Sequence, residues 1–447
     1  MKLFKFIKYN KIIAILTISM LLHSCNTKQE PIDITANDFY NGVDLVTQIM
    51  VHDIFSPPVA SRIYAYPNIA AFEIIAQNDS AYKSLAGQLK GLKPIPKANS
   101  KDVNLKVAAL VAHMELSKSL VFSEEKVIQY RDSLYNIWSN KNLKQFEASK
   151  DYGLQVVKSL KTWIDVDNYH QTRTMHKYNV DADNPSRWQP TPPAYMDGIE
   201  PHWKKIRTLV LDSASQYKPV PPPEFSLKKD SQFYKELLEV YNVSQDITQK
   251  GDTSKEIEIA QFWDCNPYVS VTRGHLMFAT KKITPGAHWI GITKIACKKS
   301  DYDFEEAVYA FTKTSIAIFD GFISCWDEKY RSNLIRPETL INQHIDETWK
   351  PILQTPPFPE YTSGHSVVSG AASTVLTTIF GDNYSFDDDT EVPYGLPIRS
   401  FASFNKAAEE AAVSRLYGGI HYRAAIDEGL TQGRKVGNLV ANNVKMK

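Results

Sequence analysis

The segment Phe358-Pro-Glu-Tyr-Thr-Ser-Gly-His365 opens an apolar run, rich in Ala, Ser, Val and Thr, that continues from Ser366 to Ile379. A Ser-Gly-His triplet before such a run predicts a tight turn that leads into a helix. The first backbone N–H groups of a helix lack partners within it, and the helix dipole favours negative charge there. The segment therefore predicts an anion-binding pocket that contains His365.

Two further segments bring positive charge to the same region. Lys329 and Arg336 are seven residues apart at the end of a long helical pattern, so we expect them on one face of a helix that ends before Pro337. Farther along the chain, Arg415 lies near the end of a predicted helix, and His421 follows on the next loop. Each residue alone would usually be structural, but their order and spacing indicate a common site.

These residue types suit an oxyanion. An anion with about two to three negative charges needs a similar positive charge, and the planar fork of Arg can donate two hydrogen bonds to its oxygens. A histidine beside the anion can carry a proton. The candidate anion-binding residues are Lys329, Arg336, Ser363, Gly364 and Arg415, and the candidate catalytic residues are His365 and His421.

Along the chain the pattern is Lys-x6-Arg-Pro, then Ser-Gly-His, then Ser-Arg-x5-His. It resembles the three-part signature shared by vanadium-dependent haloperoxidases and type 2 phosphatidic acid phosphatases, and the resemblance extends over about residues 260–440. The resemblance implies that the pocket binds vanadate, or a phosphate group in the phosphatase reaction. It also implies that His421 is the covalent ligand of vanadium or the phosphoryl-accepting nucleophile, with His365 as the acid and base opposite.

The sequence departs from the family pattern at two places. Thr362 stands where the family usually has Pro before Ser-Gly-His, which concerns the rigidity of the turn more than the chemistry. Four residues after His421, where the family often has Asp, this chain has Ala425, and Asp427 follows six residues after His421. The sequence leaves open whether Asp427 orients the ring of His421.

Trp326 and Phe358 bear on the choice between the two reactions. By resemblance, they match an aromatic pair that lines the approach of halide in chloride-oxidising haloperoxidases, although both could also be ordinary core aromatics. About 300 residues precede Lys329, whereas type 2 lipid phosphatases are usually short proteins that span the membrane several times. The long N-terminal part therefore favours the haloperoxidase branch.

The predicted function is halide oxidation by hydrogen peroxide to a hypohalous species, with vanadate as cofactor. One alternative is an acid phosphatase that cleaves a phosphomonoester through a phosphohistidine in the same pocket. A second alternative is a lipoprotein that binds an oxyanion without catalysis, but such a protein has little use for two facing histidines.

The apolar residues recur at helical spacing along most of the chain, and few runs alternate with the period of a strand. The sequence therefore predicts an all-α protein of helical bundles with irregular loops rich in Pro and aromatic residues. Pro219-Val-Pro-Pro-Pro223 is the predicted boundary between an N-terminal helical region (36–218) and a C-terminal domain (224–447) that holds the active site. We expect residues 165–202 to be irregular and to pack on the body.

The first 24 residues contain four Lys, no acidic residue and an apolar run from Ile12 to Leu22, which is too short to span a membrane. Leu22-His-Ser-Cys25 resembles a bacterial lipobox, which implies a signal peptide over residues 1–24, lipidation of Cys25 and a tether over residues 25–35. The alternative is an ordinary cleaved signal. We expect an exported protein held at a bacterial membrane, on the periplasmic or cell-surface side, by this lipid anchor only.

Without its first 24 residues the chain has 47 basic and 50 acidic residues, so nothing in its charge indicates binding to nucleic acid. Cys265, Cys297 and Cys325 show no zinc-site spacing and are expected to be buried thiols. His288 is expected to be structural, and the acidic run 387–389 to form a solvated loop.

Overall fold

The computed structural model describes residues 30–447 except 78, 252, 268, 274–275 and 280. The predicted signal peptide and Cys25 lie outside the described residues. Within the described part, helices dominate and the strands form two short hairpins, which confirms the all-α prediction.

Four long helices form the N-terminal part. They are α2 (Ala36–Asp53), α3 (Pro57–Ala76), α4 (Leu105–Lys118) and α5 (Glu124–Ile164). The segment that follows contains two short helices, α6 (Tyr169–Thr172) and η1 (Trp203–Lys205), and is otherwise irregular as far as α7. Trp188 and Trp203 of this segment are both 0% exposed, so it packs on the body as expected.

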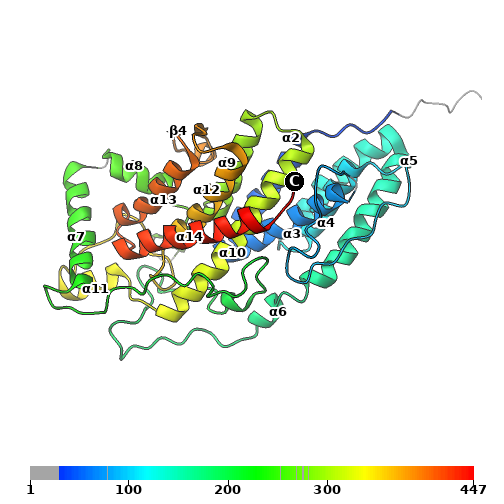
Figure 1. Ribbon diagram of the computed structural model, residues 1–447. Coiled ribbons are helices and arrows are strands. Elements are labelled where there is room, and N and C mark those ends of the chain that lie inside the picture. The colour runs from blue at the N-terminus through cyan, green and yellow to red at the C-terminus, as the bar shows by residue number, and fades with distance from the viewer. Residues whose placement is uncertain (1–29, 78, 252, 268, 274–275, 280) are drawn as a thin grey trace, which may run out of the picture.

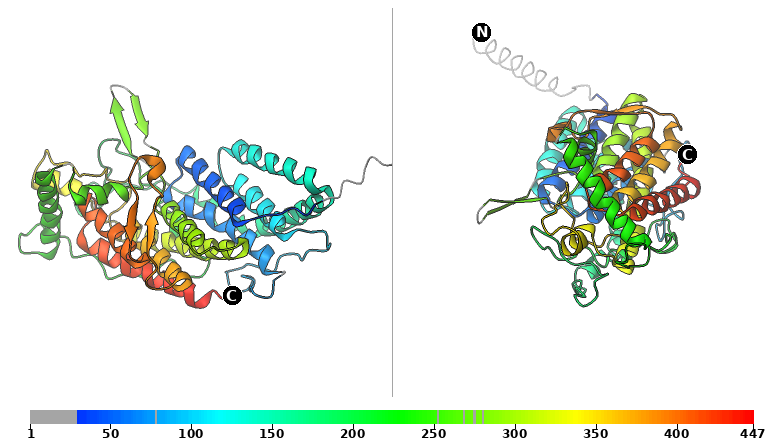
Figure 2. Two further views of the ribbon diagram at one scale, coloured as in Figure 1. Left: turned by 90° about the horizontal axis from the view of Figure 1, so that it is seen from above. Right: turned by 90° about the vertical axis from the view of Figure 1, so that its left-hand side faces the viewer.

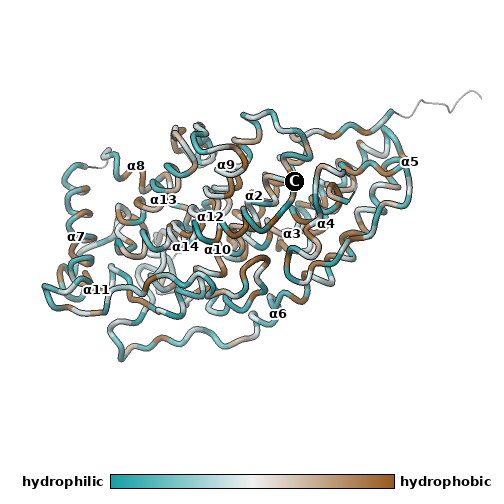
Figure 3. Tube along the Cα trace, viewed as in Figure 1, coloured by the Kyte–Doolittle hydropathy of each residue, from teal (hydrophilic) through white to brown (hydrophobic). Residues whose placement is uncertain are grey.

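The C-terminal part contains α7 (Gln232–Lys250), α8 (Lys255–Phe262), α9 (Pro285–Lys299), α10 (Phe304–Ser332), α11 (Pro337–His344), α12 (Gly364–Phe380), η2 (Val392–Tyr394), α13 (Phe404–Tyr417) and α14 (Arg423–Asn443). Helix α10 is the central axis of the molecule, because it contacts α2 and α3 of the N-terminal part as well as α9, α12 and α14 (Figure 1). One hydrophobic core joins the two parts, and Figure 3 shows hydrophobic residues along the central helices. The division at residues 219–223 stays a prediction.

The two hairpins were not predicted. β1 (Ser270–Arg273) pairs with β2 (Leu276–Ala279), in a run that is too short to predict a strand from its sequence, and the hairpin stands out from the helical body in Figure 2. β3 (Phe386–Asp388) pairs with β4 (Arg399–Phe401). The expected solvated loop at 387–389 is therefore wrong in part, because the pleat of β3 turns Asp388 into the core, where it is 0% exposed.

Helix α10 ends earlier than the sequence indicates. Asn333 adopts a left-handed conformation with φ 51° and closes α10, and Arg336 is the N-cap residue of the next helix, α11, whose first residue is Pro337. The prediction that Lys329 and Arg336 share one helix face is therefore wrong. The turn after Asn333 nevertheless brings both side chains into the protein interior, where each is 0% exposed.

Glycines let α14 pack closely against α12. A Cβ atom on Gly433 would lie 2.0 Å from the carbonyl oxygen of Val367, and one on Gly429 would lie 3.1 Å from that of Ser363. Gly437 continues this contact one turn later, where a Cβ would lie 2.6 Å from the carbonyl oxygen of Ala371. The close contact holds the first turn of α12, and with it the Ser-Gly-His triplet, in place.

No helix in the described ranges is long and apolar enough to cross a membrane.

We predict that Gly433→Ala lowers the free energy of unfolding by about 1–3 kcal/mol or more, because the new methyl group forces the two backbones apart. Gly321→Ala is the matched control, since its Cβ would meet the Cβ of Ala371 on α12 at an ordinary 3.6 Å. Alanine stabilises a helix interior by up to about 1 kcal/mol relative to glycine, so the Gly321→Ala control should be neutral or stabilising. Urea denaturation measures the free energy of unfolding of both variants. Equal values for Gly433→Ala and Gly321→Ala would contradict the close packing of α14 on α12.

Candidate active site

His421 lies on the loop between α13 and α14, with its side chain held by a carboxylate. Nδ1 of His421 is 2.7 Å from Oε1 of Glu360, which also accepts a hydrogen bond from the backbone N–H of Tyr422 at 3.0 Å. Nε2 of His421 lies 3.1 Å from Nη1 of Arg336. A guanidinium can only donate, so Nε2 carries the lone pair and Nδ1 carries the proton. His421 thus presents an unprotonated nitrogen beside a cation.

Arg336 is held rigidly by backbone carbonyl groups. Its Nε donates to Phe358 at 3.0 Å, and its Nη1 donates to Ile420 at 2.8 Å. Its Nη2 is buried and has no hydrogen-bond partner among the described residues. A buried charged donor without an acceptor is costly, so this nitrogen favours an anion beside it.

Lys329 supplies charge from the end of α10. Its ammonium group donates to the carbonyl oxygens of Pro359, Glu360 and Thr362 at 3.1, 3.0 and 2.6 Å. These three bonds use all three N–H groups, so Lys329 holds the loop before α12 and adds positive charge without a free donor. The sequence predicted the positive charge of Lys329 but not its hydrogen bonds to this loop.

Arg415 and His365 meet at the backbone of Trp263. Nη2 of Arg415 donates to the carbonyl of Trp263 at 2.7 Å, and its Nε donates to Oγ of Ser414 at 2.9 Å. His365 also hydrogen-bonds to the backbone of Trp263, while its Nε2 is buried and has no partner among the described residues. His365 therefore offers one free ring nitrogen near Arg415.

The first turn of α12 is built as the sequence predicts. Ser363 is the N-cap residue, and its Oγ accepts a hydrogen bond from Ser366 at 3.3 Å, which leaves its hydroxyl proton free to be donated. A Cβ on Gly364 would lie 3.7 Å from Trp326 and 4.0 Å from the side chain of Lys329, so the missing side chain leaves space beside the cations. Thr362 replaces the usual Pro, and its hydroxyl donates to Gln432 at 2.7 Å.

Trp326 and Phe358 form an aromatic pair, with ring centroids 5.0 Å apart. The ammonium nitrogen of Lys329 lies 4.9 Å from the ring centroid of Phe358, and the guanidinium carbon of Arg336 lies 5.1 Å from it. The ring of Phe358 therefore stabilises both cations.

Burial shapes the charge state of the pocket. It lowers the pKa of Lys329 to about 7 and that of Arg336 to about 10, although Glu360 opposes both shifts. The pKa of His421 lies well below its usual value because of burial first and the cations Arg336, Lys329 and Arg415 next. Burial likewise lowers the pKa of His365 well below the usual range, so both rings are neutral near pH 7.

Several of these residues line one cavity, which has about 30 Å³ of space for the centres of water-sized molecules. Its lining includes Trp326, Phe358, Gly364, His365, Arg415 and His421. Arg336 with its unpartnered Nη2, Arg415 and two neutral histidines supply donors and bases that suit a tetrahedral oxyanion, and Lys329 adds positive charge in its protonated form. The described residues thus fit such an anion.

All the predicted pocket residues converge, although the roles assigned to them stay predictions. Glu360 was missed, and it takes the place on the ring of His421 that the sequence left open for Asp427, whose own side chain lies on the exposed face of α14. The available signal was an acidic residue among aromatic and Pro residues just before Ser-Gly-His. His288 is fully buried and bonded, as expected of a structural histidine.

Comparison with known proteins gives four results. Residues 309–447 match the family model described as "VCPO second helical-bundle domain". A solved structure described as the first bacterial vanadium-dependent iodoperoxidase is 65% identical, covers 94% of this chain and 99% of its own, and has a TM-score of 0.91. The holo-type bacterial vanadium-dependent chloroperoxidase is 17% identical, covers 88% of this chain and 93% of its own, has a TM-score of 0.65 and supports the fold alone.

The vanadium-dependent bromoperoxidase of Corallina officinalis is 33% identical over 159 residues, which cover 33% of this chain. The chain spans 26% of the length of that protein.

We predict that Glu360→Gln weakens vanadate binding by about 10–100-fold, because removing an orienting partner of a ligand histidine typically has this effect. Asp427→Asn is the control and should bind vanadate as the unchanged protein does. Equilibrium dialysis measures both affinities. Weaker binding in the Asp427 variant alone would show that the wrong carboxylate is assigned to His421.

Proposed function

Because the chain belongs to the family of vanadium-dependent haloperoxidases, we propose that it oxidises iodide with hydrogen peroxide to a hypohalous species, with vanadate as its cofactor. The observation that supports this function most strongly is the 65% identity to a bacterial iodoperoxidase across nearly the whole chain. The choice of iodide rests on the description of that relative as an iodoperoxidase.

The pocket fits vanadate through its own donors. Nε2 of His421 would bind the vanadium, and Arg336, Arg415, the Ser363 hydroxyl and the backbone at Gly364 would donate to its oxygens. Lys329, which is bonded to the loop before α12, would partly neutralise the negative charge of the vanadate without donating to it. When bound, vanadate activates hydrogen peroxide as a Lewis acid, so that a halide can attack it.

His365 has the free nitrogen that proton transfer requires. Its neutral ring can take a proton from incoming hydrogen peroxide and later return one to the oxygen that leaves as water. Its hydrogen bond to the Trp263 backbone holds the ring in place, and Nε2 stays available on the cavity side. His365 is therefore the proposed acid and base.

Trp326 and Phe358 line the cavity and are the proposed approach for the halide. An apolar wall favours a large, weakly hydrated anion such as iodide over a strongly hydrated one, since the anion must lose water on entry. The same wall keeps bulk water from the cations, which strengthens their attraction for the anion.

The proposed function predicts iodide oxidation that depends on both hydrogen peroxide and vanadate, which can be followed by the absorbance of triiodide. Absence of oxidation at every vanadate concentration would contradict it. Phosphate release from an aryl phosphate, inhibited by vanadate, would instead indicate the phosphatase reaction in the same pocket.

Histidine variants separate binding from turnover. His365→Ala should keep vanadate and lower kcat by about 10²–10⁴-fold, the usual contribution of a placed proton carrier. His421→Ala should lose vanadate altogether. His344→Ala, on the exposed end of α11, is the control and should change neither. Loss of vanadate from the His365 variant would mean that the two histidine roles are exchanged or that His365 is structural.

We also propose that Cys25 carries a lipid anchor that holds the exported protein at a bacterial membrane. The support is the lipobox-like Leu22-His-Ser-Cys25 after a short apolar run. Cys25→Ala should move the protein from the membrane to the soluble fraction of the producing bacterium. An unchanged distribution would exclude the anchor.

A further inference from the structure

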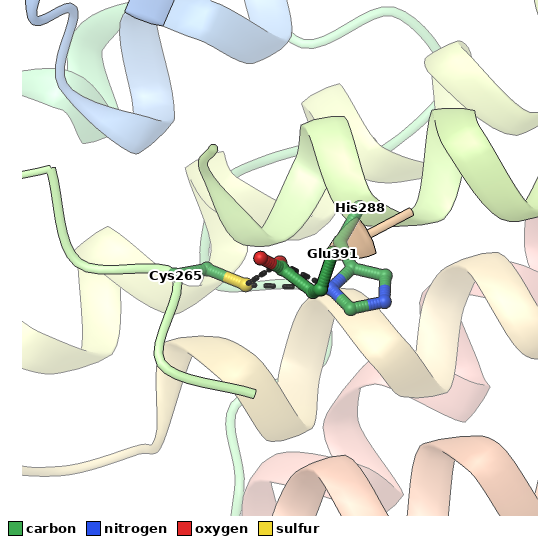
Figure 4. A group of neighbouring side chains, drawn as sticks. All are labelled: Cys265, His288 and Glu391. Atoms are coloured by element: carbon green, nitrogen blue, oxygen red, sulfur yellow. Dashed lines mark hydrogen bonds and ion pairs between the residues drawn. The ribbon is translucent and has the colours of Figure 1, made fainter. Parts of the chain in front are cut away.

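Cys265, His288 and Glu391 bring three potential metal ligands together (Figure 4). Cys265 follows α8, His288 lies in the first turn of α9, and Glu391 follows the strand β3. All three residues are buried, and no mechanistic step proposed above uses their side chains. The fold thus places a thiol, an imidazole and a carboxylate at one point from segments up to 126 residues apart.

The distances between the three ligand atoms suit one small cation. Sγ of Cys265 lies 3.5 Å from Nδ1 of His288 and 3.9 Å from Oε1 of Glu391, and Nδ1 lies 3.3 Å from Oε1. In a tetrahedral zinc site, bonds of about 2.0–2.3 Å place the ligand atoms roughly 3.3–3.6 Å apart. Only the sulfur-to-carboxylate distance exceeds this range, and a small movement of one side chain closes it.

The far side of the His288 ring resembles the outer shell of a metal site. Nε2 lies 2.8 Å from Oδ2 of Asp388, the residue that the pleat of β3 turns inward. A carboxylate on this nitrogen fixes the proton at Nε2 and leaves Nδ1 to face Cys265 and Glu391. The ring is also stacked on Trp263, with centroids 4.4 Å apart. His288 is therefore oriented in the way that a metal-binding histidine requires.

The composition of the cluster selects the cation. A thiolate, a carboxylate and a neutral imidazole carry two negative charges, which match one divalent ion. Thiolate disfavours magnesium and calcium, whereas a mixed set of sulfur, nitrogen and oxygen ligands suits zinc. Cys265 also lines the catalytic cavity, so a fourth ligand position can face that space.

We propose that Cys265, His288 and Glu391 bind one zinc ion in the wall of the catalytic cavity, with Asp388 as the partner that orients His288. Binding forms bonds from zinc to Sγ, Nδ1 and Oε1 and releases the thiol proton of Cys265, and any proton on Nδ1, to solvent. The ion would join three segments of the chain. It would also fix Trp263, whose carbonyl oxygen accepts from Arg415, and so support the anion pocket from behind.

The proposal predicts one zinc ion per chain after dialysis of the metal-free protein against zinc chloride, measured by mass spectrometry of the metal. Cys265→Ser and Glu391→Gln each remove a ligand with little change of shape, and both should weaken zinc binding by at least ~10-fold. Asp388→Asn should weaken it by about 10–100-fold. Cys297→Ser replaces another buried thiol and should keep full binding.

A wild-type chain that binds no zinc would overturn the proposal and identify the cluster as a hydrogen-bonded ion pair. Zinc that binds equally to all the variants would also overturn it, by indicating a surface site. If a variant fails to fold, the proposal is tested instead on the wild-type protein loaded with cobalt, by its absorption spectrum. A thiolate-to-cobalt charge-transfer band that persists in Cys297→Ser supports the site, and its absence from the wild type overturns it.

Discussion

A single hydrogen bond, from Nδ1 of His421 to the buried carboxylate of Glu360, determines which nitrogen of the ring faces the pocket. With Nδ1 protonated, the lone pair lies on Nε2, where it accepts a hydrogen bond from Arg336. The cations of the pocket lie around this ring. Nη2 of Arg336 is buried without an acceptor among the described residues, so an oxyanion beside it stabilises the pocket.

Helix packing holds these groups where the chemistry needs them. The glycines of α14 bring its backbone against α12 and fix the start of that helix, while Lys329 binds the loop before it through three carbonyl oxygens. The irregular segment after α5 also contributes, because the carbonyl of Ile199 accepts a hydrogen bond from Trp326 at 3.3 Å. The aromatic wall thus depends on residues far outside the three motifs.

The sequence predicted the helices and the anion pocket because both depend on local patterns: helical periodicity, capping residues and fixed spacing between charged groups. It could not place Glu360 on His421, since the contact joins residues 61 positions apart. It misplaced Arg336 because an Asn can continue a helix or end it in the left-handed conformation, and Asn333 is held in the second by contacts with Tyr178 and Trp188 from a distant segment. The Cys265 cluster was missed for the same reason, as no local spacing connects its three members.

The most direct test of this account is a crystal structure of the protein with vanadate bound. The account predicts that the vanadium is bonded to Nε2 of His421, that Nη2 of Arg336 donates to an oxygen of the anion, and that Nδ1 of His421 remains on Glu360. Vanadate bonded to His365, or held away from both histidines, would contradict it.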